Sequence, residues 1–261
     1  MAPVFATPRI GGAKSLKTRL DLLLVERGLT GSRQKAQAII LAGQVLVDGQ
    51  KMEKCGALVS AGADLRMVGE PARFVGRAGI KLEAALDHFG VDSEGKVCLD
   101  IGASTGGFTD CLLQHGALRI YAVDAGTNQL DWKLRNDPRV ISLEKTNARY
   151  LKQDVIREPI DVASVDVSFI SATLILPAVP ALLRPQAEIL VLAKPQFEVG
   201  RGQVGKGGVV RDEKLRQEAV ARVSGKLEEL GFTGIECVQS VLPGVCGNVE
   251  YFVHAIWGAE A

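Results

Sequence analysis

The sequence predicts an α/β protein with two unequal parts: a small α+β unit, then an open, doubly wound and mostly parallel sheet that ends in an antiparallel hairpin. From residue 80 onward, short apolar runs alternate with segments of helical periodicity, the pattern of a sheet covered by helices. Before residue 68, two short amphipathic segments, each followed by a glycine, precede short apolar runs. The chain has 261 residues, 47% of them hydrophobic, which is enough for one or two buried cores.

The front part contains two helices and two strands, which we expect at residues 19–27, 32–43, 45–47 and 65–68. Ser32 can cap the second helix, and the Asp48-Gly49 pair after the first strand is typical of a tight turn. Residues 1–17 contain no acid and lack the apolar core of a signal peptide, so we expect a disordered tail. The front unit then spans residues 18–68, and a linker spans residues 69–79.

The back part, residues 80–261, repeats strands and helices. We expect helices at residues 80–89, 106–115, 172–183 and 211–230. We expect strands at residues 96–101, 118–123, 139–143, 161–166 and 188–194, with a terminal pair near 232–241 and 249–257. Parallel strands joined by helices bring their carboxyl ends to one edge of the sheet, which is where such folds bind ligands.

Charge and cysteine content restrict the class of protein. The net charge is +1, but basic residues outnumber acidic ones in the first 83 residues and acidic residues predominate afterwards, which suggests a polyanionic partner for the front part. The five cysteines have no C-x-x-C spacing and the chain has only three histidines, so we expect no metal centre and no disulfide framework. No apolar run approaches the ~18 residues that span a bilayer. We therefore expect a cytoplasmic protein without a membrane partner.

A glycine-containing loop is the most informative stretch. Residues 97–108 read Val-Cys-Leu-Asp-Ile-Gly-Ala-Ser-Thr-Gly-Gly-Phe, a buried strand, a tight loop and the start of a helix. Such a loop brings backbone N–H groups close to a ligand, but its spacing differs from the G-x-G-x-x-G of dinucleotide-binding loops. Asp124 ends the next strand about 24 residues after Asp100, a spacing at which an acid commonly bonds a ribose hydroxyl. A glycine turn in another α/β fold is the alternative interpretation.

This loop resembles the first motif of S-adenosylmethionine (SAM)-dependent methyltransferases, which implies a Rossmann-like domain with SAM as its cofactor. The resemblance assigns seven residues to the cofactor: Asp100, Gly102, Ser104, Gly106 and Gly107 at the methionine end, Asp124 at the ribose and Asn147 at the adenine.

Four charged residues are the candidate catalytic groups: Lys81, Asp166, Lys194 and Glu250. Asp166 and Lys194 end strands and therefore lie at the same edge as Asp100, whereas Lys81 and Glu250 need a tertiary contact to join them. Their order resembles the catalytic tetrad of FtsJ-like ribose 2′-O-methyltransferases. Segments 165–171 and 193–198 are similar to those of the TlyA family, once labelled haemolysins and understood as ribosomal RNA 2′-O-methyltransferases. The resemblance implies methylation of a ribose 2′-hydroxyl, with cytidine as the usual target.

The chemistry requires residues of these types. A ribose 2′-hydroxyl is a poor acid, and the resemblance assigns Lys194 as the base that removes its proton. A lysine acts as a base when burial or a neighbouring cation favours its neutral form, and the apolar residues 189–193 precede Lys194. Lys81 would be the neighbouring cation, while Asp166 and Glu250 would hold the two lysines in place. SAM is a strong electrophile, so positioning should carry much of the catalysis and no metal is required.

The front part resembles the S4-type RNA-binding domain over three segments, residues 19–23, 28–33 and 43–49. The resemblance places basic residues against RNA phosphates: Arg19, Arg33 and Lys35. We also predict an RNA contact for Arg77 in the linker. Guanidinium and ammonium groups bind the RNA backbone without reading its sequence. The expected partner is ribosomal RNA, free or in ribosomal subunits.

Other interpretations stay open. Residues 200–207 nearly match a P-loop, but Gly207 replaces the hydroxyl residue that binds Mg²⁺, so we expect either a basic lid with Arg201, Lys206 and Arg211, or a plain loop. Cys246 suggests a nucleophile for pyrimidine methylation, although a packed thiol is the simpler interpretation. For the whole protein, the alternatives are a non-catalytic RNA-binding assembly factor that keeps a SAM fold, and a membrane-lytic protein.

Overall fold

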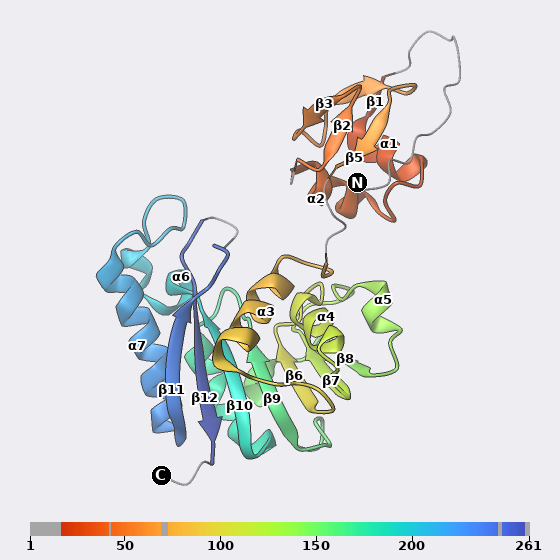
Figure 1. Ribbon diagram of the computed structural model, residues 1–261. Helices are drawn as coiled ribbons and strands as arrows, with labels where there is room; N and C mark the ends of the chain where they lie inside the picture. The colour runs from red at the N-terminus through yellow and green to blue at the C-terminus, as the bar shows by residue number, and fades with distance from the viewer. Residues whose placement is uncertain (1–16, 42, 69–72, 245–246, 259–261) are drawn as a thin grey trace. The chain divides into compact units, whose positions relative to one another are not determined.

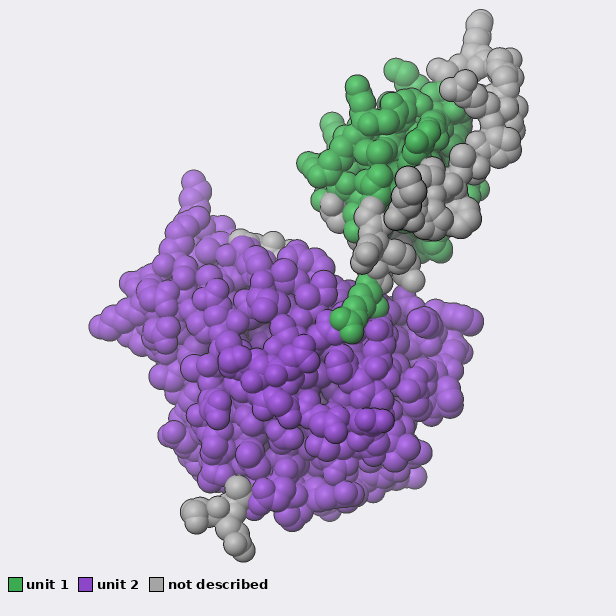
Figure 2. All heavy atoms as spheres, viewed as in Figure 1, with its two compact units in different colours: residues 1–73 green, residues 74–261 purple. Residues whose placement is uncertain are grey.

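The computed structural model describes residues 17–41, 43–68, 73–244 and 247–258. They form two compact units, divided between Arg73 and Phe74 (Figures 1 and 2). Residues 1–16 of the expected tail, residues 69–72 of the expected linker and the thiol of Cys246 lie outside the described residues, as do the side chains of Lys35 and Arg201.

The first unit is a small α+β fold. Its elements are β1 (Lys17–Arg19), α1 (Leu20–Glu26), α2 (Arg33–Leu41), β2 (Val45–Val47), β3 (Gln50–Met52), β4 (Leu58–Ser60) and β5 (Leu65–Met67). Strands β3, β2 and β5 form an antiparallel sheet, and β1 pairs with β4. Leu20, Leu24 and Ile40 are fully buried between the helices and strands. Both helices and the strands β2 and β5 form close to where the sequence predicts them, whereas β1, β3 and β4, also of three residues each, are not predicted.

The second unit is a seven-stranded sheet. Its strands are β6 (Val97–Ile101), β7 (Arg119–Val123), β8 (Val140–Leu143), β9 (Ile160–Val165), β10 (Leu183–Ala193), β11 (Phe232–Gln239) and β12 (Tyr251–Trp257). They lie in the order β11-β12-β10-β9-β6-β7-β8. Strands β10, β9, β6, β7 and β8 are parallel, and β12 is antiparallel to both of its neighbours. This arrangement confirms the predicted doubly wound sheet with a terminal antiparallel hairpin.

Helices cover both faces of the sheet (Figure 1). The α-helices are α3 (Ala78–Phe89), α4 (Gly107–Gln114), α5 (Trp132–Arg135), α6 (Pro195–Glu198) and α7 (Glu213–Glu229). Helices α3, α4 and α5 pack on one face. Helix α7 packs on the other, together with short 3₁₀ turns: η1 (Ala148–Tyr150), η2 (Ala172–Leu174), η3 (Leu176–Ala178) and η4 (Pro180–Leu182). A last turn, η5 (Arg201–Gln203), follows α6.

The helix expected at residues 172–183 is wrong. That segment forms three successive 3₁₀ turns, η2 to η4, and β10 begins at Leu183 rather than at residue 188. Pro177 and Pro180 explain the difference, because a proline has no N–H to donate and its ring clashes with the preceding helical turn. A register shift between Leu183 and Glu188 hides the start of the strand from a period-two pattern.

Part of the segment expected as a linker belongs to the second unit. Phe74 is 3% exposed and lies in the core beneath α3, which begins at Ala78. The backbone N–H of Val75 donates to Asp110 Oδ2 at 2.7 Å. A side chain at Gly79 would collide with the ring of Phe74. These contacts fix the start of α3, the helix that carries Lys81.

Candidate active site

A cavity of about 450 Å³ lies where β6, β7 and β9 end. It is lined by residues of four loops: Ile101, Gly102, Ser104, Val123, Asp124, Ala125, Gly126, Gln129, Thr146, Asn147, Ala148, Asp166, Val167, Ser168, Phe169, Ile170 and Ile175. Four of the seven predicted cofactor residues are among them, at positions 102, 104, 124 and 147. The backbone keeps the loops together, since Gly102 N donates to Val123 O at 2.8 Å and Asp166 N donates to Ile101 O at 2.8 Å.

The loop after β6 passes so close to β9 that only glycine fits at its first position. Gly102 has a φ of +89°, and a side chain there would collide with the backbone carbonyl of Asp166. Ser104 also has a positive φ, +48°, which is uncommon for a residue with a side chain. Strain of this kind persists only where the surroundings hold it, and here Ser104 N donates to Asp124 Oδ2 at 2.8 Å.

Gly106 and Gly107 do not line the cavity; they make room for packing. A Cβ at Gly107 would lie 2.9 Å from Ala78 Cβ and 3.1 Å from the backbone N of Gly79, both in α3. A Cβ at Gly106 would collide with Leu134. The small size of Gly107 therefore lets α3 approach the start of α4, which sets the position of Lys81.

Asp100 lies beneath the loop rather than in the cavity. Its carboxylate is fully buried and accepts hydrogen bonds from Thr109 Oγ1 at 2.6 Å and Ser164 Oγ at 3.4 Å. Burial raises the pKa of Asp100 to about 7, although the hydrogen bond from Thr109 opposes this shift. The carboxyl group therefore links β6 to α4 and β9 and stabilises the loop without lining the cavity.

Asp124 and Asn147 both lie at the cavity wall. Asp124 accepts hydrogen bonds from Ser104 N at 2.8 Å and Gly126 N at 2.6 Å, one on each oxygen. Each carboxylate oxygen has a second lone pair, so Asp124 can still accept from a ligand hydroxyl. Asn147 caps η1 and accepts from Arg149 N at 3.2 Å, which leaves its amide N–H₂ group for a ligand.

Glu144 is an anchor that the sequence analysis does not identify. Its carboxylate accepts from the backbone N–H groups of Asn128 and Gln129 at 3.0 Å and pairs with Arg135 at 2.7 Å. The hydrogen bond from Arg135 lowers the pKa of Glu144 to about 2, with help from the backbone donors. Glu144 thereby fixes the loop that brings Gln129 to the cavity. An acid directly after β8 is the signal that could have indicated it.

The four predicted catalytic residues form two ion pairs. Lys194 Nζ lies 2.5 Å from Asp166 Oδ1, with the two side chains 11% and 16% exposed. Lys81 Nζ lies 2.6 Å from Glu250 Oε2, with the side chains 10% and 3% exposed. Lys194 also donates to Ser168 Oγ at 2.9 Å.

Strand register brings the two pairs to the same edge of the sheet. Ala193 pairs with Tyr251 in the last rung of β10 and β12, so Lys194 and Glu250 follow directly on neighbouring strands. Gln196, at the start of α6, lies 3.5 Å from Glu250 through its Nε2. Lys81 reaches this edge from α3, the tertiary contact that the sequence alone could not show.

A second cavity, of about 470 Å³, lies beside the first and shares Phe169 and Ile170 with it. Gln196 and Phe197 line it from α6. The ring centroids of Phe169 and Phe197 are 5.4 Å apart, and Phe169 is 93% exposed with a φ of +65°. An exposed aromatic residue in a strained backbone conformation is typical of a binding site.

Glu198 ties together the two segments that carry Asp166 and Lys194. It is 3% exposed and accepts from Ser171 Oγ at 2.5 Å and Ala172 N at 2.7 Å. Burial raises the pKa of Glu198. Glu198 belongs to the family segment 193–198, but its role does not follow from the sequence, because only the fold brings it to Ser171, 27 residues away.

Asn248 fixes the end of the glycine-containing loop over residues 200–210. Its amide is 2% exposed, donates to Gly208 O at 2.8 Å and accepts from Val210 N at 2.9 Å. Lys206 and Arg211 are exposed. The end of the loop is therefore hydrogen-bonded to Asn248, two positions before Glu250.

The predicted RNA-binding residues divide between the two units. Arg19 and Arg33 both contact the buried carboxylate of Asp21. Arg77 is exposed at the N-cap of α3.

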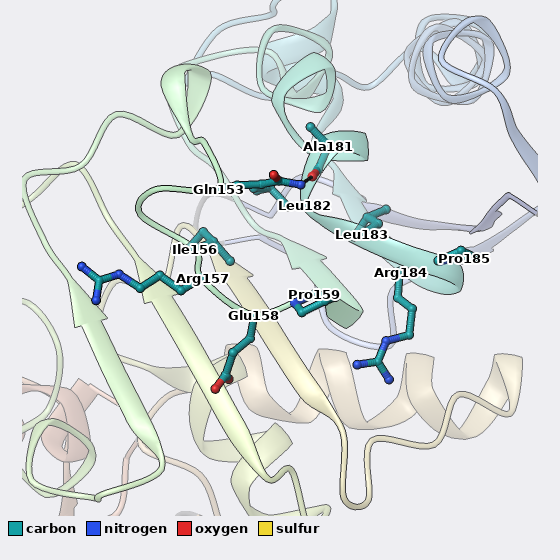
Figure 3. Close-up of a pocket in the computed structure, with 10 residues that line it drawn as sticks. All are labelled: Gln153, Ile156, Arg157, Glu158, Pro159, Ala181, Leu182, Leu183, Arg184 and Pro185. Carbon is teal, nitrogen blue, oxygen red and sulfur yellow. Dashed lines mark hydrogen bonds between the residues drawn. The ribbon is translucent and has the colours of Figure 1, made fainter.

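A further cavity of about 470 Å³ lies at the opposite edge of the sheet, before β9 and at the start of β10 (Figure 3). Two of its charged residues are held in ion pairs, Arg184 with Asp161 at 3.0 Å and Glu158 with Arg119 at 2.8 Å. Ligands of open α/β sheets bind at the carboxyl ends of the strands, so we assign this cavity no part in catalysis.

Comparison with known proteins identifies the class that this fold and site define. The model of the FtsJ-like methyltransferases matches residues 74–257, and that of the S4 domain matches residues 18–65. The 16S/23S rRNA (cytidine-2′-O)-methyltransferase TlyA of Mycobacterium tuberculosis is 47% identical over 238 residues, 91% of this chain and 89% of that protein. Hemolysin A of Brachyspira hyodysenteriae is 45% identical over 239 residues, 91% of this chain and 99% of that protein.

A solved structure agrees with these relatives. The structure described as a hemolysin from Streptococcus thermophilus has a TM-score of 0.73 and 42% identity, covering 92% of this chain and 88% of that one. The chain belongs to the TlyA family of FtsJ-like methyltransferases and carries an S4 domain. Within the part of the chain that the structure describes, no helix is long and apolar enough to cross a membrane.

Proposed function

We propose that this protein transfers a methyl group from SAM to the 2′-hydroxyl of a cytidine in ribosomal RNA. The observation that carries the proposal is the pair of lysine–carboxylate contacts at the carboxyl edge of the sheet, Lys194 with Asp166 and Lys81 with Glu250, of which Asp166 also lines the first cavity. The TlyA relative of Mycobacterium tuberculosis is named for the same reaction.

The residues of the first cavity fit SAM. Gly102, where a side chain would collide with the backbone of Asp166, and Ser104, in a strained turn, both line the cavity. Asp124 can accept from ribose hydroxyls, and Asn147 lies at the wall where it can meet the adenine. SAM, when bound there, supplies an activated methyl group.

Lys194 serves as the base. Its Nζ accepts the proton of the ribose hydroxyl, after which the oxygen is the nucleophile for the methyl group. Asp166 and Ser168 hold the amine at the cavity edge, and Glu250 holds Lys81 near the same place. Lys81 is a second ammonium group at the same edge of the sheet and can stabilise the developing alkoxide. Residues that hold the reacting groups in line supply much of the rate enhancement.

The test is methyl transfer from labelled SAM to unmodified ribosomal subunits and to naked ribosomal RNA, followed by mass spectrometry of the nucleosides. We expect 2′-O-methylcytidine, and the two substrates reveal whether an assembled subunit is needed. A base-methylated nucleoside would contradict the role of the ion pairs. Measurable SAM binding without any product would instead favour the non-catalytic RNA-binding factor.

A further inference from the structure

Asp21, in α1, is a buried acid surrounded by hydrogen-bond donors. Its side chain is 0% exposed. Arg19 donates Nε to Oδ1 at 3.0 Å and Nη2 to Oδ2 at 2.9 Å, in a bidentate contact. From α2, Arg33 Nε and Gln37 Nε2 both donate to Oδ2, at 2.9 Å and 2.8 Å. One carboxylate of α1 thus contacts side chains of β1 and α2.

The arginines that Asp21 holds are not themselves buried. The side chain of Arg19 is 42% exposed and that of Arg33 is 53% exposed. Asp21 therefore contacts one side of each guanidinium group while the rest of the side chain reaches solvent. A bidentate contact fixes the plane of a guanidinium group, so Arg19 loses less conformational entropy when it meets a second anion.

We propose that Asp21 is a positioning residue for RNA docking, which holds Arg19 and Arg33 as one preformed fork for backbone phosphates of the substrate RNA. This inference rests on the proposed function, because it takes RNA as the partner of the S4 domain. Asp21 itself touches no phosphate; it acts through the two arginines.

Charge and geometry predict opposite effects of removing Asp21, which makes the proposal testable. An acid beside two phosphate-binding cations weakens their attraction to a polyanion. If only charge mattered, its loss would tighten RNA binding. If Asp21 positions the arginines, its loss leaves two mobile side chains and weakens binding, even though the net charge of the protein rises.

The experiment measures binding of the full-length protein to a short fluorescent RNA hairpin across a series of KCl concentrations. We expect Asp21→Asn to raise the Kd about fivefold and to reduce the slope of log K against log [KCl] by about one. Glu26→Gln is the matched control: it removes the same charge from the exposed side of the same helix and should leave the Kd unchanged or slightly lower. The slope is a readout that a merely structural role would not move.

A second variant protects the test against misfolding. Position 21 is buried, so the melting temperature of Asp21→Asn is compared with that of the wild type. Arg19→Lys keeps the charge, but one ammonium group cannot reproduce the bidentate contact, and we expect it to weaken RNA binding by a similar factor. If Asp21→Asn lowers the melting temperature, the RNA affinity of Arg19→Lys tests whether positioning of Arg19 matters.

Two outcomes overturn the proposal. Wild-type affinity and slope in both Asp21→Asn and Arg19→Lys would show that positioning does not matter. Full RNA binding by Arg19→Ala with Arg33→Ala would show that the fork does not dock RNA. Neither outcome touches the proposed methyl transfer, which the nucleoside analysis tests separately; conversely, a failed methylation assay leaves the binding measurements interpretable.

Discussion

At the residue scale, the candidate site depends on how single charged side chains are held. Lys194 has both an acid and a hydroxyl as partners, and these hold its amine next to Asp166 and Ser168 of the cavity wall. Asp100 is fully buried and accepts hydrogen bonds from the hydroxyl groups of Thr109 and Ser164. The first arrangement holds an amine beside the cavity, while the second fixes a loop.

We expect Lys194→Ala to reduce methyl transfer by roughly 10³-fold, because the base is lost, while SAM binding is unchanged. Isothermal titration with SAM and the methylation assay measure the two properties separately. Lys152→Ala is the control, since Lys152 is exposed and lines neither cavity beside the ion pairs. Turnover near the wild-type rate in Lys194→Ala would remove the lysine from the mechanism.

Asp100 gives the protein a specific pH dependence of stability. With a pKa of about 7 in the folded state, its carboxyl group holds a proton that the unfolded chain releases near pH 4. The unfolded state therefore binds fewer protons between these values, and the contribution of Asp100 to the free energy of unfolding falls as pH rises through that window. The fall amounts to at most about 4 kcal/mol.

Asp100→Asn should remove this dependence, because an amide does not ionise. Urea unfolding of the wild type and the variant at pH 5 and at pH 7.5 measures it. We expect the stability of the variant relative to the wild type to be higher at pH 7.5 than at pH 5. An equal difference at both pH values would contradict a protonated Asp100.

At the element scale, the contact between α3 and α4 determines where Lys81 lies. Because Gly107 has no side chain, α3 packs directly against the start of α4. Asp110 accepts a hydrogen bond from Val75 N and so holds the segment before α3. The family resemblance assigns Gly107 to the cofactor, whereas the structure places it against Ala78 and Gly79 of α3. A loop motif cannot distinguish these uses, since both require a residue without a side chain.

Gly107→Ala should displace α3 from α4 and with it Lys81 from Glu250. We expect the rate of methyl transfer to fall by about tenfold or more, and stability to fall by about 1–3 kcal/mol through overpacking. Gly225→Ala in α7 is the matched control: a Cβ there meets nothing within 4 Å, so it should stabilise the helix by about 1 kcal/mol and leave activity unchanged. Equal behaviour of the two variants would mean that α3 does not depend on Gly107.

The elements also show what a sequence can predict. The parallel strands with Asp124, Asp166 and Lys194 at their ends follow from short apolar runs that stop at polar residues. The 3₁₀ turns over 172–182 do not follow, because apolar periodicity continues across prolines that forbid the helix. Anchors such as Glu144 and Glu198 are equally hidden: their partners are backbone N–H groups and hydroxyls of other segments, which no residue pattern marks.

At the scale of the whole molecule, the two units have separate hydrophobic cores. The core of the first unit contains Leu24 among residues 20–65, and the cores of the second contain Leu190 among residues 74–257. Among the residues that the structure describes, no buried one belongs to both sets. Each unit can therefore lose stability without the other, and binding of RNA and of SAM should be separable in the full chain.

Leu24→Ala and Leu190→Ala test this separation, because each removes a side chain that is 0% exposed and costs about 2–5 kcal/mol locally. We expect Leu24→Ala to lower RNA affinity while SAM binds as in the wild type, and Leu190→Ala to lower SAM affinity while the protein still binds the RNA hairpin. Calorimetric melting should show one transition shifted in each variant and the other in place. A single transition that shifts in both variants would mean that the two units unfold cooperatively. A core substitution in the S4 domain would then lower methyl transfer by destabilising the second unit, and not only by weakening RNA binding.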